Sequence, residues 1–137
     1  MIILRDLDLF VTSAQDATTL LQKWLRTIDP LDRDKEHFIV LIMDVRLKVQ
    51  VVDVVSVGIL NGVLVHAREV YRRAVALGAS KVVVAHNHPS SICSPSDEDR
   101  ERTKKLRQAG EIIGIPLVDH IIFSESSFYS FADEGLL

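Results

Sequence analysis

The stretch that decides the fold is KVVVAHNHPSSICSPSDED, residues 81–99. Its first part, KVVVAH, is a short apolar run, which is typical of a central strand buried on both faces of a sheet. The strand is expected to end at His86, and the polar segment at 86–95 predicts a loop. Ser96 to Ile113 then predicts a long charged helix, closed by Gly114 and Pro116. A buried strand, a loop and a helix therefore follow one another here.

The rest of the chain alternates helical and strand patterns. Apolar residues at helical spacing predict two more helices, and β-rich runs predict three more strands. In chain order these segments are a helix at 14–25, a hairpin of 37–45 and 48–58, a loop at 59–65, a helix at 66–79 with Gly78 as its C-cap, a strand at 117–124 and a short terminal segment at 128–137. This order predicts an α/β protein with three layers, α/β/α, around a mixed sheet.

Composition places the chain among globular proteins of one domain. Its 137 residues suit one core, so we expect a single domain over 1–137, with 1–13 as an N-terminal extension. A formal net charge of −3 gives no strong electrostatic footprint for nucleic acid.

One cysteine, Cys93, excludes an intramolecular disulfide, and the acidic N-terminus is unlike a signal peptide. No apolar stretch is long enough to span a membrane, so we expect a cytoplasmic protein. The oligomeric state is left open.

Two histidines and an aspartate around the loop suggest a metal site. His86 and His88 are two residues apart directly after the strand, so both can point to the same side. If Ser96 caps the next helix, Asp99 lies in its first turn and faces the loop. Two imidazoles and a carboxylate suit Zn²⁺ and leave a fourth position for water. Ser96 and Asp99 also fit a capping box, which accounts for Ser96 but not for the histidines.

The spacing His-x-His, seven residues, Ser-x-x-Asp matches without a gap the metal-binding signature of the JAMM (MPN-type) metalloprotease family. More narrowly, the chain resembles the RadC branch of that family, a bacterial group long labelled as DNA-repair proteins. The resemblance covers about residues 16–135 and implies a JAMM/MPN, cytidine-deaminase-like architecture. Further matching positions are Thr103, Leu106, Ala109, Gly110, Gly114, Ile115, Leu117, Asp119, His120 and Ile121.

The chain departs from the RadC pattern in three places. Ser91 replaces a usual Gly, Ala67 replaces a usual Pro, and the residues at 59–62 replace a Gly-Thr-Leu-type turn. A helix-hairpin-helix DNA-binding region often precedes this domain in RadC proteins and is absent from these 137 residues. We therefore expect either a fragment or a short form.

The resemblance implies roles for particular residues. His86, His88 and Asp99 would be zinc ligands, and Ser96 would stabilise the oxyanion of a substrate carbonyl. JAMM enzymes are peptidases and isopeptidases, so the implied reaction is hydrolysis of a peptide or isopeptide bond in a peptide or protein substrate, with Zn²⁺ as the cofactor.

A glutamate upstream of the histidines acts as general acid and base in this family. Glu36 matches it, because it stands directly before an apolar strand. Its alternative is an exposed acid in the charged run at 32–36. Glu69 is the rival, but an acid beside Arg68 and Arg72 on a helix more often belongs to a surface ion pair.

Several roles and functions remain open. His120 is either a residue that orients a ligand or a structural histidine. Cys93 is expected to be a small loop hydrophobe rather than a ligand. Besides a hydrolase, the chain could be a DNA-repair-associated or nucleic-acid-associated module, or a metal-stabilised interaction domain without catalysis. The tripeptide His-Asn-His resembles the residues that name the HNH nucleases, and this likeness is taken as a coincidence. The basic residues between 100 and 107 are predicted to form a solvated helix face.

Overall fold

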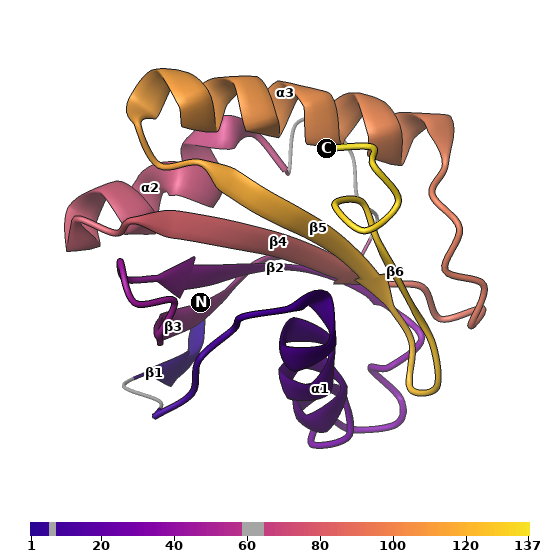
Figure 1. Ribbon diagram of the computed structural model, residues 1–137. Helices are drawn as coiled ribbons and strands as arrows, with labels where there is room; N and C mark the ends of the chain where they lie inside the picture. Colours follow the sequence, from indigo (N-terminus) through magenta and orange to yellow (C-terminus); the bar gives the residue numbers. More distant parts are fainter. Residues whose placement is uncertain (6–7, 59–64) are drawn as a thin grey trace.

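The described residues, 1–5, 8–58 and 65–137, form a six-stranded sheet with helices on both faces in this computed structural model (Figure 1). The strands are β1 (Ile2–Arg5), β2 (Glu36–Met43), β3 (Val49–Gly58), β4 (Lys81–Asn87), β5 (Leu117–Phe123) and β6 (Phe128–Ser130). The helices are α1 (Ala14–Leu25), α2 (Ala67–Leu77) and α3 (Asp97–Ile113). The predicted α/β class and mixed sheet are confirmed.

The strand order is β1-β3-β2-β4-β5-β6. β4 and β5 run parallel, and the other neighbouring pairs run antiparallel. Because α3 connects the two parallel strands, it crosses the sheet from the end of β4 back to the start of β5 (Figure 1). The crossover places the start of α3 beside the end of β4, where the predicted site lies.

Local sequence sets the helix ends. Ser13, His66 and Ser96 each accept a backbone N–H at the start of α1, α2 and α3. Gly78 and Gly114 follow α2 and α3 at φ 62° and 85°, a conformation that a residue without Cβ adopts at little cost. Gly78 is therefore the C-cap that the sequence predicts.

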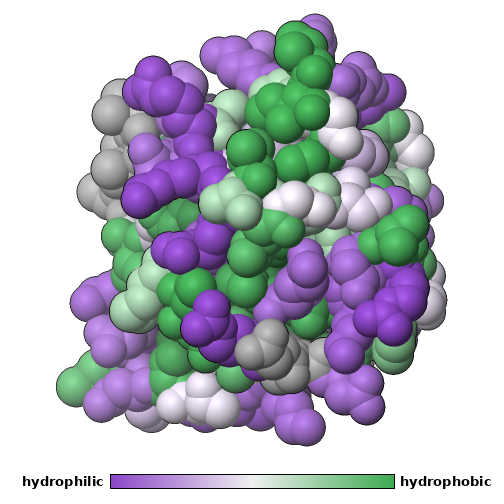
Figure 2. All heavy atoms as spheres, turned by 90° about the vertical axis from the view of Figure 1, so that its left-hand side faces the viewer, coloured by the Kyte–Doolittle hydropathy of each residue, from purple (hydrophilic) through white to green (hydrophobic). Residues whose placement is uncertain are grey.

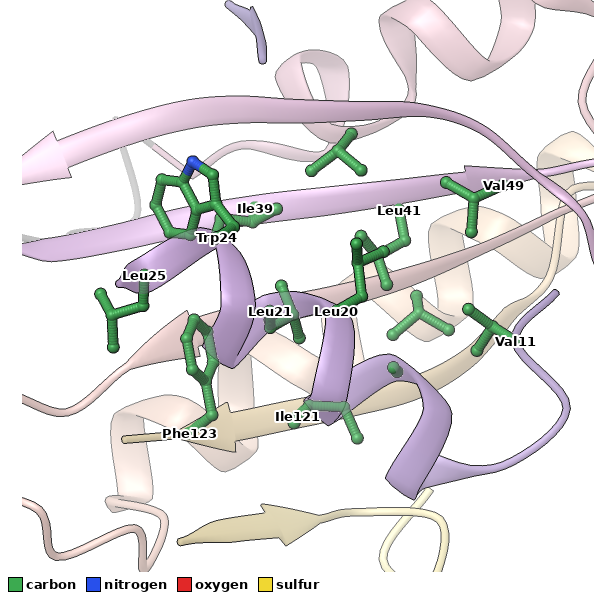
Figure 3. Close-up of a cluster of buried hydrophobic side chains, with 14 of the residues drawn as sticks. Val11, Leu20, Leu21, Trp24, Leu25, Ile39, Leu41, Val49, Ile121 and Phe123 are labelled. Atoms are coloured by element: carbon green, nitrogen blue, oxygen red, sulfur yellow. The ribbon is translucent and has the colours of Figure 1, made fainter. Parts of the chain in front are cut away.

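Side chains alternate between the two faces of the sheet, and we name each face by a helix that covers it. On the α1 face, Leu21 and Trp24 pack against the sheet in a closed apolar cluster (Figure 3). The sheet residues of that cluster include Ile39, Leu41, Val83, Ala85, Ile121 and Phe123. On the α3 face, the alternate sheet residues, among them Phe38, Val40, Val82 and Val84, pack against Tyr71 of α2 and Leu106 of α3. β4 is thus buried on both faces, as predicted.

The two edge strands were not predicted. Residues 2–5, within the expected N-terminal extension, form β1 on the edge of β3, and residues 128–130 form β6 on the edge of β5. Both strands are short. β1 forms its backbone hydrogen bonds with β3, which is distant in sequence, and β6 forms its backbone hydrogen bonds with β5, which precedes it by a turn. The apolar periodicity of so few residues cannot indicate a strand. Of the loop expected at 59–65, residues 59–64 lie outside the described residues.

The two ends of the sheet differ in their surfaces. The end of β4 and the start of α3 lie on the right of Figure 1, and the ends of α2 and α3 lie on the left. On that left-hand side, hydrophobic side chains gather in a band between hydrophilic ones (Figure 2). Exposed apolar residues at the two helix ends are Val75, Leu77, Ile112 and Ile113. Among the described residues, none of the helices is both long enough and apolar enough to cross a membrane.

Candidate metal centre

His86 and His88 leave the end of β4 on the α3 face. His86 is almost fully buried, and the backbone N–H of His88 donates to the carbonyl of Phe123 at 2.9 Å, which ties the loop to the end of β5. The two Nε2 atoms lie 3.0 Å apart. The i, i+2 spacing therefore brings both rings together, as predicted.

Asp99 approaches the two histidines from the first turn of α3. One carboxylate oxygen, Oδ1, lies 3.3 Å from Nε2 of His86, and the other, Oδ2, lies 3.7 Å from Nε2 of His88. The predicted capping box fixes this position, because the N–H of Ser96 donates to Oδ2 at 2.9 Å. One ligand atom from each of the three residues lies within 4.8 Å of the others, so this group could hold a metal ion.

Burial and mutual contact set the charges of the three side chains. Burial lowers the pKa of His86. Hydrogen bonding to Asp99 raises the pKa of His88. Burial alone would raise the pKa of Asp99, but its hydrogen bonds with the two histidines outweigh burial and lower it well below the usual range. An ionised carboxylate beside two imidazoles is an arrangement that attracts a cation.

The second ring nitrogen of His86 leads into a buried polar chain. Its Nδ1 lies 2.8 Å from Nε2 of His120, on β5. The other nitrogen of His120 contacts the hydroxyl of Thr103, and that hydroxyl donates to the backbone carbonyl of Asp99 at 2.7 Å. Burial lowers the pKa of His120 well below its ordinary value, so its ring is neutral.

Glu36 begins β2, and its backbone is held on both sides by Asn87. The side-chain oxygen of Asn87 accepts the N–H of His37 at 2.7 Å, and its amide donates to the carbonyl of Lys35 at 2.9 Å. The antiparallel register places Phe38 beside His86, so Glu36, two residues earlier, shares the α3 face with His86. Asn87 therefore fixes the strand on either side of Glu36.

The predicted catalytic and metal-binding residues meet in one open cleft of about 390 Å³. Its lining consists of Glu36, His88, Pro89, Ser90, Ser96, Glu98, Asp99 and Arg102. His86 lies behind the cleft, buried beneath His88 and Asp99. The rival acid, Glu69, lines a separate hollow of about 260 Å³ with Asp53 and Arg73, so the structure does not bring it to this cleft.

Cys93, which is expected to be a small loop hydrophobe, and His37 lie outside this cleft. Cys93 is buried, and its sulfur contacts the hydroxyl of Ser127 at 3.3 Å, in a small cluster with Ile122 and Phe131. His37 packs edge-on against Trp24.

The basic stretch of α3 is partly occupied by ion pairs within the helix. Arg102 lies 3.3 Å from Asp99, and Arg107 lies 3.4 Å from Glu111. The remaining basic residues of the stretch, Arg100, Lys104 and Lys105, are exposed. These positions agree with the solvated helix face expected from the alternation of acids and bases.

The sequence patterns do not indicate the buried hydrogen bonds of Asn87 and Thr103. Asn87 is the middle residue of the His-Asn-His tripeptide, and Thr103 is one of the positions that match the RadC pattern. Their signal was weak, because each acts through partners on other elements or through a backbone group. A polar residue at an otherwise apolar strand end, as at Asn87, is the one pattern that could have indicated a buried hydrogen-bonding role.

Comparison with known proteins agrees with these observations. Residues 11–136 match the family described as RadC-like JAB domain. UPF0758 protein TTE0897 of Caldanaerobacter subterraneus subsp. tengcongensis is 39% identical over 125 residues, which cover 91% of this chain and 52% of the relative. UPF0758 protein GSU0386 of Geobacter sulfurreducens is 45% identical over 106 residues, which cover 77% and 46%. A UPF0758 protein of Thermotoga maritima is 41% identical over 122 residues, which cover 89% and 54%.

The chain spans about half the length of the curated relatives it matches. The family match itself covers most of the chain and includes the histidines, the aspartate and Glu36. The sequence resemblance is therefore confirmed, and this chain belongs to the RadC-like JAB domain family.

Proposed function

We propose that this chain is a zinc-dependent hydrolase that cleaves peptide or isopeptide bonds in a peptide or protein substrate. The observation that carries the proposal is the cleft, because Glu36, Ser96, His88 and Asp99 line it together. It combines a metal-ligand set, a carboxylate for proton transfer and a hydroxyl donor on one accessible surface. Membership of the RadC-like JAB family supports the same chemistry, since the resemblance to JAMM enzymes implies a zinc peptidase.

The donor set fits zinc. Two imidazoles and one carboxylate, with a fourth position for water, form a ligand pattern of catalytic zinc sites. Ligand atoms at zinc-binding distance around a tetrahedral ion lie roughly 3.3 Å from one another. Nε2 of His86 lies 3.0 Å from Nε2 of His88 and 3.3 Å from Oδ1 of Asp99, and one ligand atom from each of the three residues lies within 4.8 Å of the others. When bound, zinc supplies Lewis acidity, which makes water a nucleophile near neutral pH.

Glu36 is suited to move the protons of the reaction. Burial lowers the pKa of His86 and the hydrogen bond to Asp99 raises that of His88, and the negative charge of Glu36 adds a small upward contribution to both, so it lies within electrostatic reach of the ligand set. A carboxylate there accepts a proton from the attacking water and later donates it to the leaving amine. Glu36 is half-buried at the cleft wall, which leaves it open to a substrate.

Ser96 is suited to bind the carbonyl oxygen of the scissile bond. Its Oγ accepts the backbone N–H of Asp99 at 3.1 Å. That contact uses a lone pair and leaves the hydroxyl proton for donation to a substrate oxygen. Such a donor opposes the negative charge that develops on the carbonyl during attack. Capping and oxyanion binding therefore use different parts of the same hydroxyl.

The experiment that tests the function compares Glu36→Gln with the wild type. The zinc-loaded proteins are incubated with quenched fluorescent peptides and with a peptide that carries a branched lysine ε-amide bond. We expect cleavage by the wild type, its loss with a chelator, and a decrease of about 100-fold or more in Glu36→Gln. Glu69→Gln is the matched control and retains activity, because Glu69 lies in a different hollow.

Equal cleavage by Glu36→Gln and the wild type would contradict the role of Glu36. Bound zinc without cleavage of either probe would favour the alternative, a metal-stabilised interaction domain without catalysis. The zinc content of each preparation is measured alongside, so that loss of activity is separated from loss of metal.

A further inference from the structure

We propose that Thr103 and His120 form a positioning relay that holds His86 in the tautomer whose Nε2 lone pair faces the metal site. The inference rests on the proposed function only in taking His86 as a zinc ligand. Three elements contribute to the relay: α3 through Thr103, β5 through His120, and β4 through His86. Neither Thr103 nor His120 lines the cleft, so both act through other residues.

The relay begins at a group that can only accept. The hydroxyl of Thr103 lies 2.7 Å from the backbone carbonyl oxygen of Asp99, four residues earlier in α3. A carbonyl has no proton, so Thr103 donates its one hydroxyl proton there. The same hydroxyl also contacts Nδ1 of His120. Having given its proton to Asp99, Thr103 can only accept, and Nδ1 of His120 therefore carries a hydrogen.

The tautomer of His120 then decides that of His86. Both rings are buried. A neutral imidazole carries one proton, so His120, protonated on Nδ1, offers a lone pair on Nε2. This Nε2 lies 2.8 Å from Nδ1 of His86, which therefore donates. Nε2 of His86 then offers its lone pair to a metal ion in the space shared with His88 and Asp99, whereas without an ion the carboxylate of Asp99 competes for a hydrogen on the same nitrogen.

Aromatic neighbours hold the planes of the two rings. Phe131 stacks on His120 with ring centroids 4.8 Å apart and planes 10° apart. Phe38 stacks on His86 at 6.0 Å and 13°, and its edge also faces His120 at 5.8 Å. Tilting either imidazole would break this packing, so stacking fixes the ring planes, and the hydrogen bonds fix which ring atom faces each partner.

Both ends of the relay belong to the same donor set. One end is the backbone carbonyl of Asp99, whose carboxylate faces the site, and the other is the ring of His86. The relay thus joins the first turn of α3 to the end of β4 through β5. Hydrogen bonds of this kind fix the orientation of a ligand and raise its basicity, and their loss typically costs about 10- to 100-fold in metal affinity.

The opposite arrangement of protons would block the site. If Thr103 donated to His120, then His120 would donate to His86, and Nε2 of His86 would carry the hydrogen. A metal ion would have to displace that proton before it could bind. The carbonyl of Asp99, as an acceptor for Thr103, is the group that selects the competent arrangement.

The first test reads the tautomers directly. Nitrogen-15 NMR of the histidine rings is recorded on the zinc-loaded wild type at about pH 8, above the ordinary pKa of histidine. We expect His86 and His120 to be protonated on Nδ1. Protonation of His120 on Nε2, or binding of zinc through Nδ1 of His86, would overturn the proposal, and this readout requires neither a variant nor a substrate.

The second test measures zinc affinity by competition with a chelator. We expect Thr103→Val to bind zinc at least about 10-fold more weakly, His120→Phe to lose as much or more, and Thr103→Ser to retain the wild-type affinity. Phenylalanine preserves the stacking on Phe131 while removing both nitrogens. Thr18→Val is the matched control, because Thr18 is a buried threonine of α1, on the other face of the sheet.

Wild-type affinity in both Thr103→Val and His120→Phe would overturn the relay while leaving the proposed hydrolase intact. Weakened zinc binding in these variants, together with a wild type that cleaves no peptide, would support the relay and contradict only the hydrolase. A wild type that binds no zinc would overturn both. If Thr103→Val does not fold, as judged by circular dichroism, Thr103→Ser and the wild-type NMR spectrum still decide the question.

Discussion

The two faces of the central sheet use the same strands for opposite purposes. On the α1 face, β4 contributes Val83 and Ala85 to a closed apolar cluster under the helix. On the α3 face, the same strand contributes Val82 and Val84 to a second apolar cluster and then ends in His86, within a buried polar group. On the α1 face the strand ends in Asn87, whose amide bonds the backbone of residues 35 and 37, whereas on the α3 face it ends in a histidine that contacts His88 and Asp99.

This difference separates the residues that stabilise the fold from the residues of the candidate metal centre. Apolar burial stabilises the fold by about 25 cal/mol per Å² of surface removed from water. Buried polar groups cost free energy unless each is paired. At the end of β4, several buried polar groups lie close together, and each has a hydrogen-bond partner. Substitutions on the α1 face should therefore affect stability alone, whereas those at the site should affect metal binding first.

The largest expected effect is the loss of the metal in His88→Ala. His88 supplies one of the three donor atoms, and the remaining two lie on residues that also pair with each other. We expect protein purified without added zinc to contain the metal in the wild type and to lack it in the variant, as measured by elemental analysis. His66→Ala is the control, since His66 caps α2 outside the site. Equal metal content in His88→Ala and the wild type would contradict the assignment of His88 as a metal ligand.

Leu21→Ala tests the α1 face. Leu21 is 1% exposed and packs in the cluster of Figure 3. We expect the free energy of unfolding to fall by about 2–5 kcal/mol, because a buried leucine leaves a cavity when truncated. Zinc affinity of the folded protein should stay at the wild-type value. Chemical denaturation without metal and chelator competition measure the two quantities, and a parallel loss of affinity would show that the faces are not independent.

Tyr71 provides a pH test within the apolar part of the α3 face. Burial raises the pKa of its hydroxyl from 10.0 to about 12. Between these values the unfolded chain loses the proton and the folded chain keeps it, so stability falls as the pH rises above 10. The shift corresponds to about 2–3 kcal/mol.

Tyr71→Phe removes this dependence. At neutral pH it loses the hydrogen bond to the carbonyl of Leu106, at a cost of about 1 kcal/mol. Denaturation of both proteins from neutral to alkaline pH gives the comparison. The difference between them should shrink and reverse as the pH rises, and a constant difference would contradict the buried hydroxyl.

Asn87→Ala tests whether the buried amide at the end of β4 contributes to stability rather than to metal binding. Asn87 is buried, and its amide bonds the backbone of residues 35 and 37 on either side of Glu36. We expect a loss of about 1–3 kcal/mol in stability, because buried backbone groups lose their partners. Zinc affinity should change little, since Asn87 donates to no ligand. Unfolding midpoints measure the stability, and chelator competition measures the zinc affinity. An unchanged midpoint would contradict the claim that Asn87 stabilises the backbone on either side of Glu36.

Ser91→Gly has the smallest expected effect. Ser91 adopts φ 68°, in the left-handed region, at a position where RadC-like chains usually have Gly. Glycine relieves strain of about 1–2 kcal/mol and loses part of this gain through the greater freedom of the unfolded chain. We expect an increase in stability within about 1 kcal/mol, measured by thermal unfolding. A clear decrease would indicate that contacts of the Ser91 side chain outweigh its backbone strain.

The fold was largely predictable because its central elements carry strong local patterns. The apolar run at 81–86, the hairpin around Arg46 and the three helices all lie where periodicity places them, and Ser96, Gly78 and Gly114 are the predicted cap residues. β1 and β6 escaped prediction, because their pairing depends on a neighbouring strand and their few residues carry no pattern of their own.

The sequence alone was enough to predict the group of candidate metal ligands. His86, His88 and Asp99 are close along the chain, and a strand end followed by a capped helix brings them together by local geometry. Only the tertiary structure decided what surrounds them. Glu36 reaches the cleft, and Glu69 does not, because β2 pairs with β4 and α2 lies elsewhere. Asn87, Thr103 and His120 gain their roles from strands and helices that meet across the sheet. Local spacing can bring donors together, but contacts between elements distant in sequence exist only once the core has packed.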